Sequence, residues 1–172
     1  LIDHGAGAVS LLATRGAPKL VFNVHLDTVP SSPDWTADPL RLRVTDERAI
    51  GLGACDIKGA AACLLAAAAA SQGDAAFLFS SDEEANDARC IPAFLKSAHG
   101  FEHAIIAEPT AAQAVLAHRG IAAVRMQFCG RAGHASGANA ATDSAVHNAI
   151  RWGNSALKLV DSYARQRFGG LT

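Results

Sequence analysis

Several residues of the chain belong to the types that bind divalent metal ions, and they recur at similar places in the sequence pattern. They are His25, Asp27, Asp56, Glu83, Glu84 and Glu108. Each group follows a short apolar segment that we expect to form a strand. Because the parallel strands of an α/β sheet present their carboxyl ends at one edge, the sequence predicts that these side chains converge there.

The residue types suit zinc. Imidazole nitrogen and carboxylate oxygen both bind Zn²⁺ at about 2.0–2.2 Å. One histidine with several carboxylates favours two ions that share a bridging carboxylate. We expect Asp56 to be the bridge, because it is central in the order of candidates and lies in a glycine-rich turn. Asp27 stands two residues after His25, on the same face of an extended chain, and its carboxylate is predicted to hold the ring N–H.

The adjacent residues Glu83 and Glu84 are predicted to divide two tasks. Neighbouring side chains diverge, so one carboxylate can bind metal while the other faces a water molecule at the metal. A metal lowers the pKa of that water toward about 7, and a nearby carboxylate can then act as general base. Taken singly, each candidate has an ordinary explanation, such as a helix N-cap for Asp56 or a solvated acidic pair. Only their joint occurrence favours a metal centre.

The elements that must position these residues alternate between strand and helix. The expected strands are 9–14, 19–24, 49–52, 75–79 and 104–107, and the expected helices are 59–70 and 91–98. The alanine-rich segment 59–70 has high helix propensity and is expected to be buried. This alternation predicts an α/β fold with a mostly parallel sheet and flanking helices.

The pattern changes near residue 111. The segments 114–117 and 121–129 predict a hairpin around Arg119 and Gly120, and a long helix is expected from about Asp143. The apolar stripe of this helix is formed by Val146, Ala149, Ile150, Leu157 and Val160. We therefore predict two partial domains, a catalytic metal-binding domain at 1–110 and the start of an α+β lid or dimerisation domain at 111–172.

Composition and charge exclude several classes of protein. The chain has 172 residues, of which half are apolar and 18% are charged, with a formal net charge of −1. Such a balance lacks the basic surplus that would hold nucleic acid or an anionic membrane. The longest apolar run, 59–70, is too short to cross a bilayer. Four cysteines without C-x-x-C spacing indicate buried, reduced thiols and a cytoplasmic protein. Without an initiator Met, and with an incomplete second domain, we expect truncation at both ends.

Five stretches carry a family resemblance, and together they cover nearly the whole chain. They are residues 23–30, 51–59, 81–84, 107–110 and 130–136. In these stretches the chain resembles the acetylornithine deacetylase, succinyl-diaminopimelate desuccinylase and carboxypeptidase family of dizinc metallohydrolases, peptidase family M20. The resemblance implies a zinc-exopeptidase-like catalytic domain followed by a lid domain, through which family members dimerise.

The resemblance also implies a role for each matched residue. The first zinc ion would be held by His25, Asp56 and Glu108, and the second by Asp56 and Glu84. Glu83 would be the general base and then the acid that protonates the leaving amine. The implied catalytic set also includes Asp27, which supports His25, and His134. This lid histidine would reach into the active site of the partner subunit and stabilise the oxyanion.

Segments 79–87 and 117–120 look most like the arginine-biosynthesis deacetylases, and we favour N-acetylcitrulline over N-acetylornithine as substrate. The implied cofactors are two Zn²⁺ ions, for which Co²⁺ can substitute, and the implied assembly of the full-length protein is a homodimer. A desuccinylase or an exopeptidase of the same family is an alternative. Another alternative is a non-catalytic metal-binding or dimerising remnant, because the family's last histidine ligand, which completes the second zinc site, has no counterpart in this sequence.

Overall fold

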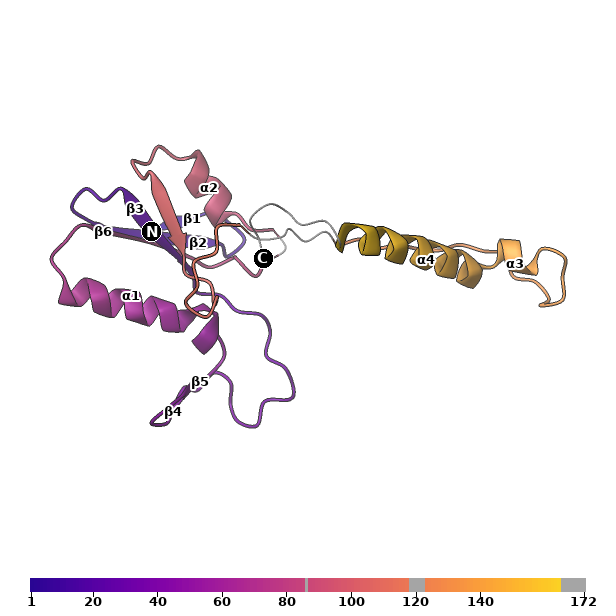
Figure 1. Cartoon of the computed structure of the whole chain (residues 1–172), viewed down its shortest axis with the longest axis horizontal. Coiled ribbons are helices and arrows are strands. Elements are labelled where there is room, and N and C mark those ends of the chain that lie inside the picture. The colour runs from indigo at the N-terminus through magenta and orange to yellow at the C-terminus, as the bar shows by residue number, and fades with distance from the viewer. Residues whose placement is uncertain (86, 118–122, 165–172) are drawn as a thin grey trace. The chain divides into compact units, whose positions relative to one another are not determined.

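The computed structural model describes residues 1–85, 87–117 and 123–164 of the chain (Figure 1). The chain divides into two compact units, Leu1–Gln113 and Ala114–Thr172. Among the described residues, no helix combines the length and the apolar character that a membrane crossing requires.

A five-stranded mixed sheet forms the centre of the first unit. Its spatial order is β1 (Ile2–Asp3), β2 (Val9–Arg15), β6 (Ala75–Ser80), β3 (Leu20–His25) and β7 (His103–Ile106). Strand β3 is parallel to both β6 and β7, whereas β2 is antiparallel to β6 and to β1. Strand β1 therefore runs in the same direction as β3, β6 and β7, and only β2 opposes them. The prediction of an α/β fold with a mostly parallel sheet is confirmed.

Helices cover both faces of this sheet, as Figure 1 shows. Helix α2 (Cys90–Lys96) packs on one face, where Ile91 and Phe94 contact a buried cluster of Val21, Ala76 and Leu78. Helix α1 (Gly59–Ala70) packs on the other face through Ala61, in a cluster with Val24 and Ile57. The two clusters use alternate residues of β3 and β6, as the two-residue period of a strand requires.

The prediction that segment 59–70 forms a helix is confirmed, but the prediction that this helix is buried is wrong. Only Ala61 is buried, and most other positions of α1 are exposed. A helix that packs on one face of a sheet buries only the stripe that points at the sheet. The expectation of four buried thiols is also wrong, since only Cys90 is buried, although all four cysteines are free.

The segment that carries Asp56 departs from the predicted arrangement. Strand β5 (Ala49–Ile50) pairs only with β4 (Arg43–Val44), in a separate two-stranded sheet. A short helical segment that is interrupted at Asp56, η1 (Ala54–Lys58), then leads directly into α1. Asp56 therefore does not follow a strand of the main sheet, and the prediction that it does is wrong. The main-sheet strands β3, β6 and β7 lead to the other candidates of the first unit.

Ile57 anchors this turn to the sheet. It is fully buried and packs with Val24 of β3 and Ala61 of α1. We expect Ile57→Ala to lower the free energy of unfolding of the full-length protein by about 2–5 kcal/mol, because the smaller side chain leaves a cavity. Chemical denaturation measures this loss. Leu65→Ala, at an exposed position of α1, is the control and should cost far less. An equal loss in both variants would contradict the anchoring role.

The second unit consists mainly of helix. Helix α3 (Ala140–Asp143) precedes α4 (Ala145–Ala164), so the long helix predicted from about Asp143 is confirmed. Within the described residues the predicted hairpin is absent, because neither 114–117 nor 123–129 is a strand. Its expected turn at Arg119 and Gly120 lies outside the described residues. Two strands alone are marginally stable, and the described residues of this unit contain no third strand to support them.

The apolar stripe predicted on the long helix is present but exposed. Four of its members are at least half exposed, namely Val146, Ile150, Leu157 and Val160. The expectation of a helix packed on an antiparallel sheet is therefore wrong for the described part of this unit. Elsewhere on α4, Trp152 contacts Phe128, with ring centroids 5.8 Å apart.

Candidate metal centre

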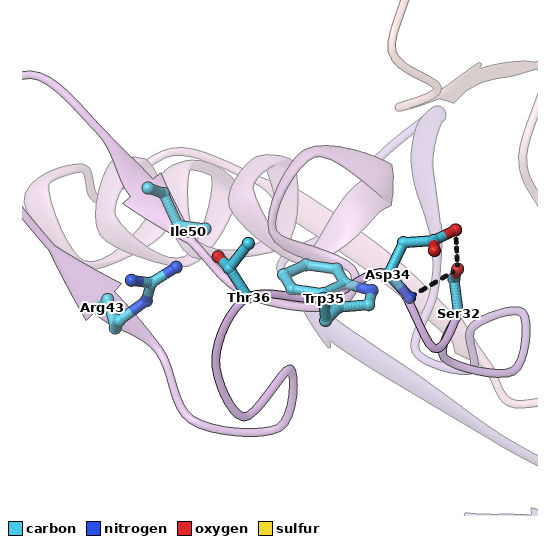
Figure 2. A pocket seen from close by; sticks show the side chains of 6 residues that line it. All are labelled: Ser32, Asp34, Trp35, Thr36, Arg43 and Ile50. Carbon is cyan, nitrogen blue, oxygen red and sulfur yellow. Dashed lines mark hydrogen bonds between the residues drawn. The ribbon is translucent and has the colours of Figure 1, made fainter.

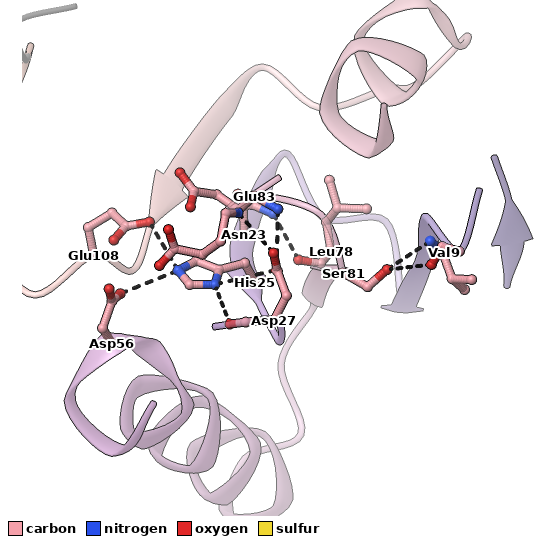
Figure 3. Close-up of polar contacts among 11 residues, drawn as sticks. Val9, Asn23, His25, Asp27, Asp56, Leu78, Ser81, Glu83 and Glu108 are labelled. Atoms are coloured by element: carbon pink, nitrogen blue, oxygen red, sulfur yellow. Dashed lines mark hydrogen bonds and ion pairs between the residues drawn. The ribbon is translucent and has the colours of Figure 1, made fainter. Parts of the chain in front are cut away.

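Three parallel strands bring candidate ligands to one edge of the sheet. His25 is the last residue of β3, Glu83 and Glu84 follow β6, and Glu108 follows β7. The register pairs His25 with Ser80, the last residue of β6. Figure 3 shows Glu83 and Glu108 near the His25 ring, with Asp56 approaching from the start of α1. The sheet therefore gathers residues that lie more than 80 positions apart in the sequence.

The orientation of His25 is fixed by its main-chain neighbour. The side chain is 2% exposed, and Nδ1 lies 3.0 Å from the carbonyl oxygen of Asp27. A carbonyl oxygen only accepts hydrogen bonds, so Nδ1 must carry the proton and donate it. In the neutral ring this leaves the lone pair on Nε2, which is the arrangement that a metal ligand requires.

Two carboxylates face the Nε2 atom of His25. Asp56 Oδ1 lies 3.3 Å from it and Glu108 Oε1 lies 3.8 Å from it. In two groups, His25 with Asp56 and Glu108, and His25 with Glu83 and Glu84, one ligand atom per residue lies within 4.8 Å of the others. The same imidazole is thus shared by two adjacent sets of oxygen atoms.

The pKa values of His25 and Glu108 are both raised at this site. Burial lowers the pKa of His25, but the Asp27 carbonyl and the charges of Glu108, Glu83 and Asp56 outweigh this effect, so the pKa is raised above 6.5. Burial raises the pKa of Glu108 above 4.5, against the opposing effect of His25, and the Asp56 and Glu83 carboxylates raise it further. The raised pKa of Glu108 thus reflects burial first and nearby carboxylates second, whereas that of His25 reflects its hydrogen bond to Asp27 together with the surrounding carboxylates.

The donor set fits a divalent cation. With Nδ1 protonated, Nε2 of His25 presents a lone pair to oxygen atoms of Asp56 and Glu108 that are also acceptors. Lone pairs that point at one another repel, so a proton or a cation must lie between them. One imidazole nitrogen with carboxylate oxygens is a ligand set that zinc accepts. The residues present therefore suit the metal that the sequence predicts.

Asp27 acts through both its main chain and its side chain. Its carboxylate lies 3.6 Å from His25 Nδ1, farther than its own carbonyl oxygen. The carboxylate instead accepts hydrogen bonds from the main-chain N–H of Glu83 at 3.2 Å and of Glu84 at 2.8 Å. The carbonyl therefore orients the ring that the carboxylate was expected to hold, and the carboxylate fixes the two glutamates. No feature of the sequence indicated this second contact.

Glycines allow the turn around Asp56 to form. Gly53 has a φ of 77°, which favours glycine, and a Cβ there would lie 2.7 Å from Thr28 Cγ2. A Cβ on Gly59 would lie 2.6 Å from the carbonyl oxygen of Ala54. Because these two residues have no Cβ, the backbone can approach Thr28 and Ala54 closely enough for the turn to fold back at the start of α1. Together with buried Ile57, they bring Asp56 to His25 without a strand of the main sheet.

His134, the remaining candidate, belongs to the second unit. Its side chain is exposed, and Nδ1 lies 2.7 Å from the hydroxyl oxygen of Ser136. The structure thus brings together six of the seven sequence candidates within the first unit, while His134 lies in the other unit. Sequence reasoning did not identify Ile57 as an anchor. The available signal was its apolar side chain directly after a candidate ligand.

A separate open hollow of about 400 Å³ lies beside the loop that follows β3, as Figure 2 shows. It is lined by Ser32, Asp34, Trp35, Thr36, Arg43 and Ile50. None of these residues is a candidate ligand, so the hollow and the metal centre share no side chain. The site is therefore defined by its ligand chemistry and by the sheet edge, and not by the depth of the surface.

Three curated relatives illustrate the similarity of this chain to known enzymes. It is 64% identical to N-acetyl-L-citrulline deacetylase of Xanthomonas campestris pv. campestris over 172 residues, which is 100% of this chain and 47% of the relative. It is 36% identical to succinyl-diaminopimelate desuccinylase of Beijerinckia indica over 137 residues, 69% of this chain and 36% of the relative. It is also 36% identical to acetylornithine deacetylase of Myxococcus xanthus over 147 residues, 79% of this chain and 38% of the relative.

The chain therefore spans less than half the length of each of these relatives. The sequence profile of one family, described as Peptidase family M20/M25/M40, matches residues 21–162. This range includes His25, Asp56 and Glu108, the residues that the fold brings to one edge of the sheet. By sequence profile, by fold and by its relatives, the chain belongs to peptidase family M20/M25/M40.

Proposed function

We propose that this chain is part of a metal-dependent amidohydrolase that removes the acetyl group from N-acetylcitrulline. The observation that carries the hydrolase assignment is the convergence of His25, Asp56 and Glu108 at the sheet edge, with Glu83 beside them. The relative that is 64% identical over the whole chain acts on N-acetylcitrulline, according to its name, and supports this substrate.

The ligands of the first ion follow from the group of His25, Asp56 and Glu108. The ligands of the second ion follow from the family resemblance, because the other group joins Glu84 to His25 and Glu83. We assign His25, Asp56 and Glu108 to the first ion, and Asp56 and Glu84 to the second, with Asp56 as the bridge. Zn²⁺ suits this set of ligands, and Co²⁺ is expected to replace it. When bound, such ions polarise an amide carbonyl and lower the pKa of water.

We assign proton transfer to Glu83. Its side chain is exposed, while its main-chain N–H is held by Asp27, so the carboxylate is free to meet water and substrate from a fixed backbone. The carboxylate takes the proton of the attacking water and returns it to the leaving amine nitrogen. His134 is proposed to stabilise the oxyanion of the tetrahedral species from the lid of a partner subunit.

The remaining proposals concern the full-length protein. We place it in arginine biosynthesis in the cytoplasm, a location that its four free cysteines support. We assign residues 1–110 to a catalytic domain and residues 111–172 to a lid domain through which two copies associate. The exposed apolar stripe on α4 supports such a docking surface, since large exposed apolar patches mark interaction sites.

The substrate assignment is tested by comparing acyl amino acids with the full-length protein. We expect kcat/KM for N-acetylcitrulline to exceed that for N-acetylornithine and for N-succinyl-diaminopimelate by at least about tenfold, a difference of about 1.4 kcal/mol in transition-state binding. A dipeptide serves as the exopeptidase substrate in the same assay. A higher kcat/KM for any of the other three compounds would overturn the proposed substrate. Absence of hydrolysis for all four would overturn the hydrolase assignment.

A further inference from the structure

The two glutamates of the candidate site lie at the centre of a tight turn. The N–H of Ala85 donates to the carbonyl oxygen of Asp82 at 3.3 Å, which closes the turn around Glu83 and Glu84. The preceding strand is held by the Leu26 N–H, which donates to the Ser80 carbonyl oxygen at 2.8 Å. The position of both carboxylates therefore depends on what fixes this turn from either side.

Asp27 fixes the turn from the side of β3, and Asp82 fixes it from the side of α2. One oxygen of the Asp82 carboxylate, Oδ2, accepts the main-chain N–H of Arg89 and that of Cys90, the latter at 3.0 Å. The first residue of the turn is thus tied through its side chain to the first residue of the helix. This contact closes the loop that contains Glu83 and Glu84.

Asp82 is buried, so its hydrogen bonds to the main chain matter for the stability of the loop. The residue is only 5% exposed, and its other carboxylate oxygen, Oδ1, has no hydrogen-bond partner among the described residues. A carboxylate is costly at a buried position unless hydrogen bonds compensate for its lost hydration. An apolar residue of similar size would fill the space but would leave the N–H groups of Arg89 and Cys90 unpaired.

We propose that Asp82 is a positioning residue, which holds the Glu83–Glu84 turn in its working place by closing the loop onto the start of α2. Among the described residues, the hydrogen bonds of the Asp82 carboxylate go to the main-chain N–H groups of Arg89 and Cys90 and not to a candidate ligand, so Asp82 acts through the backbone. A displacement of about 1 Å in a catalytic group is enough to cost about 100-fold in rate. The inference about catalysis rests on the proposed function, whereas the inference about the backbone does not.

Three variants of the full-length protein test the inference. Asp82→Ala removes the acceptor oxygen, and Asp82→Asn keeps one acceptor oxygen for the same two N–H groups. Phe94→Leu is the matched control, because it weakens the packing of α2 on the sheet without changing the loop contacts. Each variant is compared by Tm, by kcat and KM for N-acetylcitrulline, and by hydrogen–deuterium exchange of the peptide that spans residues 80–90 in the absence of substrate.

We expect Asp82→Ala to lower kcat by at least about tenfold with KM within about twofold of the wild type. Exchange in the 80–90 peptide should become faster in this variant, while Asp82→Asn stays near the wild type in both measurements. Phe94→Leu should lower Tm with wild-type kcat. If Asp82→Ala does not fold, Asp82→Ser, whose shorter side chain cannot span the same distance, takes its place.

Two results would overturn the inference. One is a variant without the Asp82 acceptor whose exchange in residues 80–90 matches the wild type. The other is a loss of kcat in Phe94→Leu as large as that in Asp82→Ala, which would reduce Asp82 to a general contributor to stability. If the wild type hydrolyses none of the acyl amino acids, the proposed function fails, and the exchange measurements still decide whether Asp82 holds the turn.

Discussion

Glu83→Gln is expected to lower kcat of the full-length protein for its acyl amino acid by about 10²–10⁴-fold, the range typical of a general base. Glutamine has nearly the same size as glutamate but cannot take a proton from water at neutral pH. The main-chain N–H of residue 83 donates to the Asp27 carboxylate, and this hydrogen bond does not involve the side chain of residue 83, so the turn should keep its place. KM should therefore change little compared with kcat.

The control for this variant is Glu102→Gln. Glu102 is an exposed glutamate that pairs with Lys19 at 3.0 Å, away from the candidate ligands. Exposed ion pairs contribute little to stability, so this variant should keep wild-type kcat and Tm. Metal content is measured for both proteins, because Glu83 is assigned to proton transfer and not to metal binding. Wild-type kcat in Glu83→Gln would remove the residue from the mechanism, and a loss of metal would reassign it as a ligand.

His25→Ala is expected to weaken divalent metal binding by more than about 100-fold, since loss of even an outer partner of a ligand costs about 10–100-fold. The His25 ring is the only imidazole in either candidate group among the described residues, and both groups share it. Its removal also leaves the Asp56 and Glu108 carboxylates facing each other without the nitrogen. Metal content after dialysis against a chelator measures the effect directly.

His103→Ala is the matched control, because His103 is an exposed histidine of β7 and belongs to neither group. It should retain as much metal as the wild type. Full metal retention by His25→Ala would contradict the assignment of the centre. A second readout is Tm with and without added Zn²⁺, since a metal that binds the folded state raises Tm. This rise should be present in the wild type and in His103→Ala and be absent in His25→Ala.

Local sequence determined the elements of the first unit closely. The alanine run at 59–70 forms a helix with those bounds, and the apolar segments before His25 and before Glu83 form strands β3 and β6. The alanine run has high helix propensity, and the two apolar segments have the length that is typical of strands. The alternation of strand and helix was enough to predict an α/β sheet whose strand ends carry the candidate ligands.

The sequence predicted less where the outcome depends on contacts with other elements of the fold. Residues 123–129 alternate in the manner of a strand, yet they form none among the described residues, because a strand needs a partner and period alone supplies none. Helix α1 is apolar along its length, yet it is mostly exposed, because only one stripe meets the sheet. Asp56 was expected at the end of a main-sheet strand, but it reaches His25 from the short interrupted helical segment η1 before α1.

The sequence by itself determined which residue types are available for metal and proton chemistry, and which segments carry them as strands and helices. The tertiary structure decided how those residues are held: the Asp27 carbonyl orients His25, the Asp27 carboxylate fixes Glu83 and Glu84, and Ile57 anchors Asp56. The physical reason is the range of the interactions. Strand and helix formation depends on neighbours a few positions away, whereas the contact between Asp27 and Glu84 spans 57 positions and exists only once the sheet has formed.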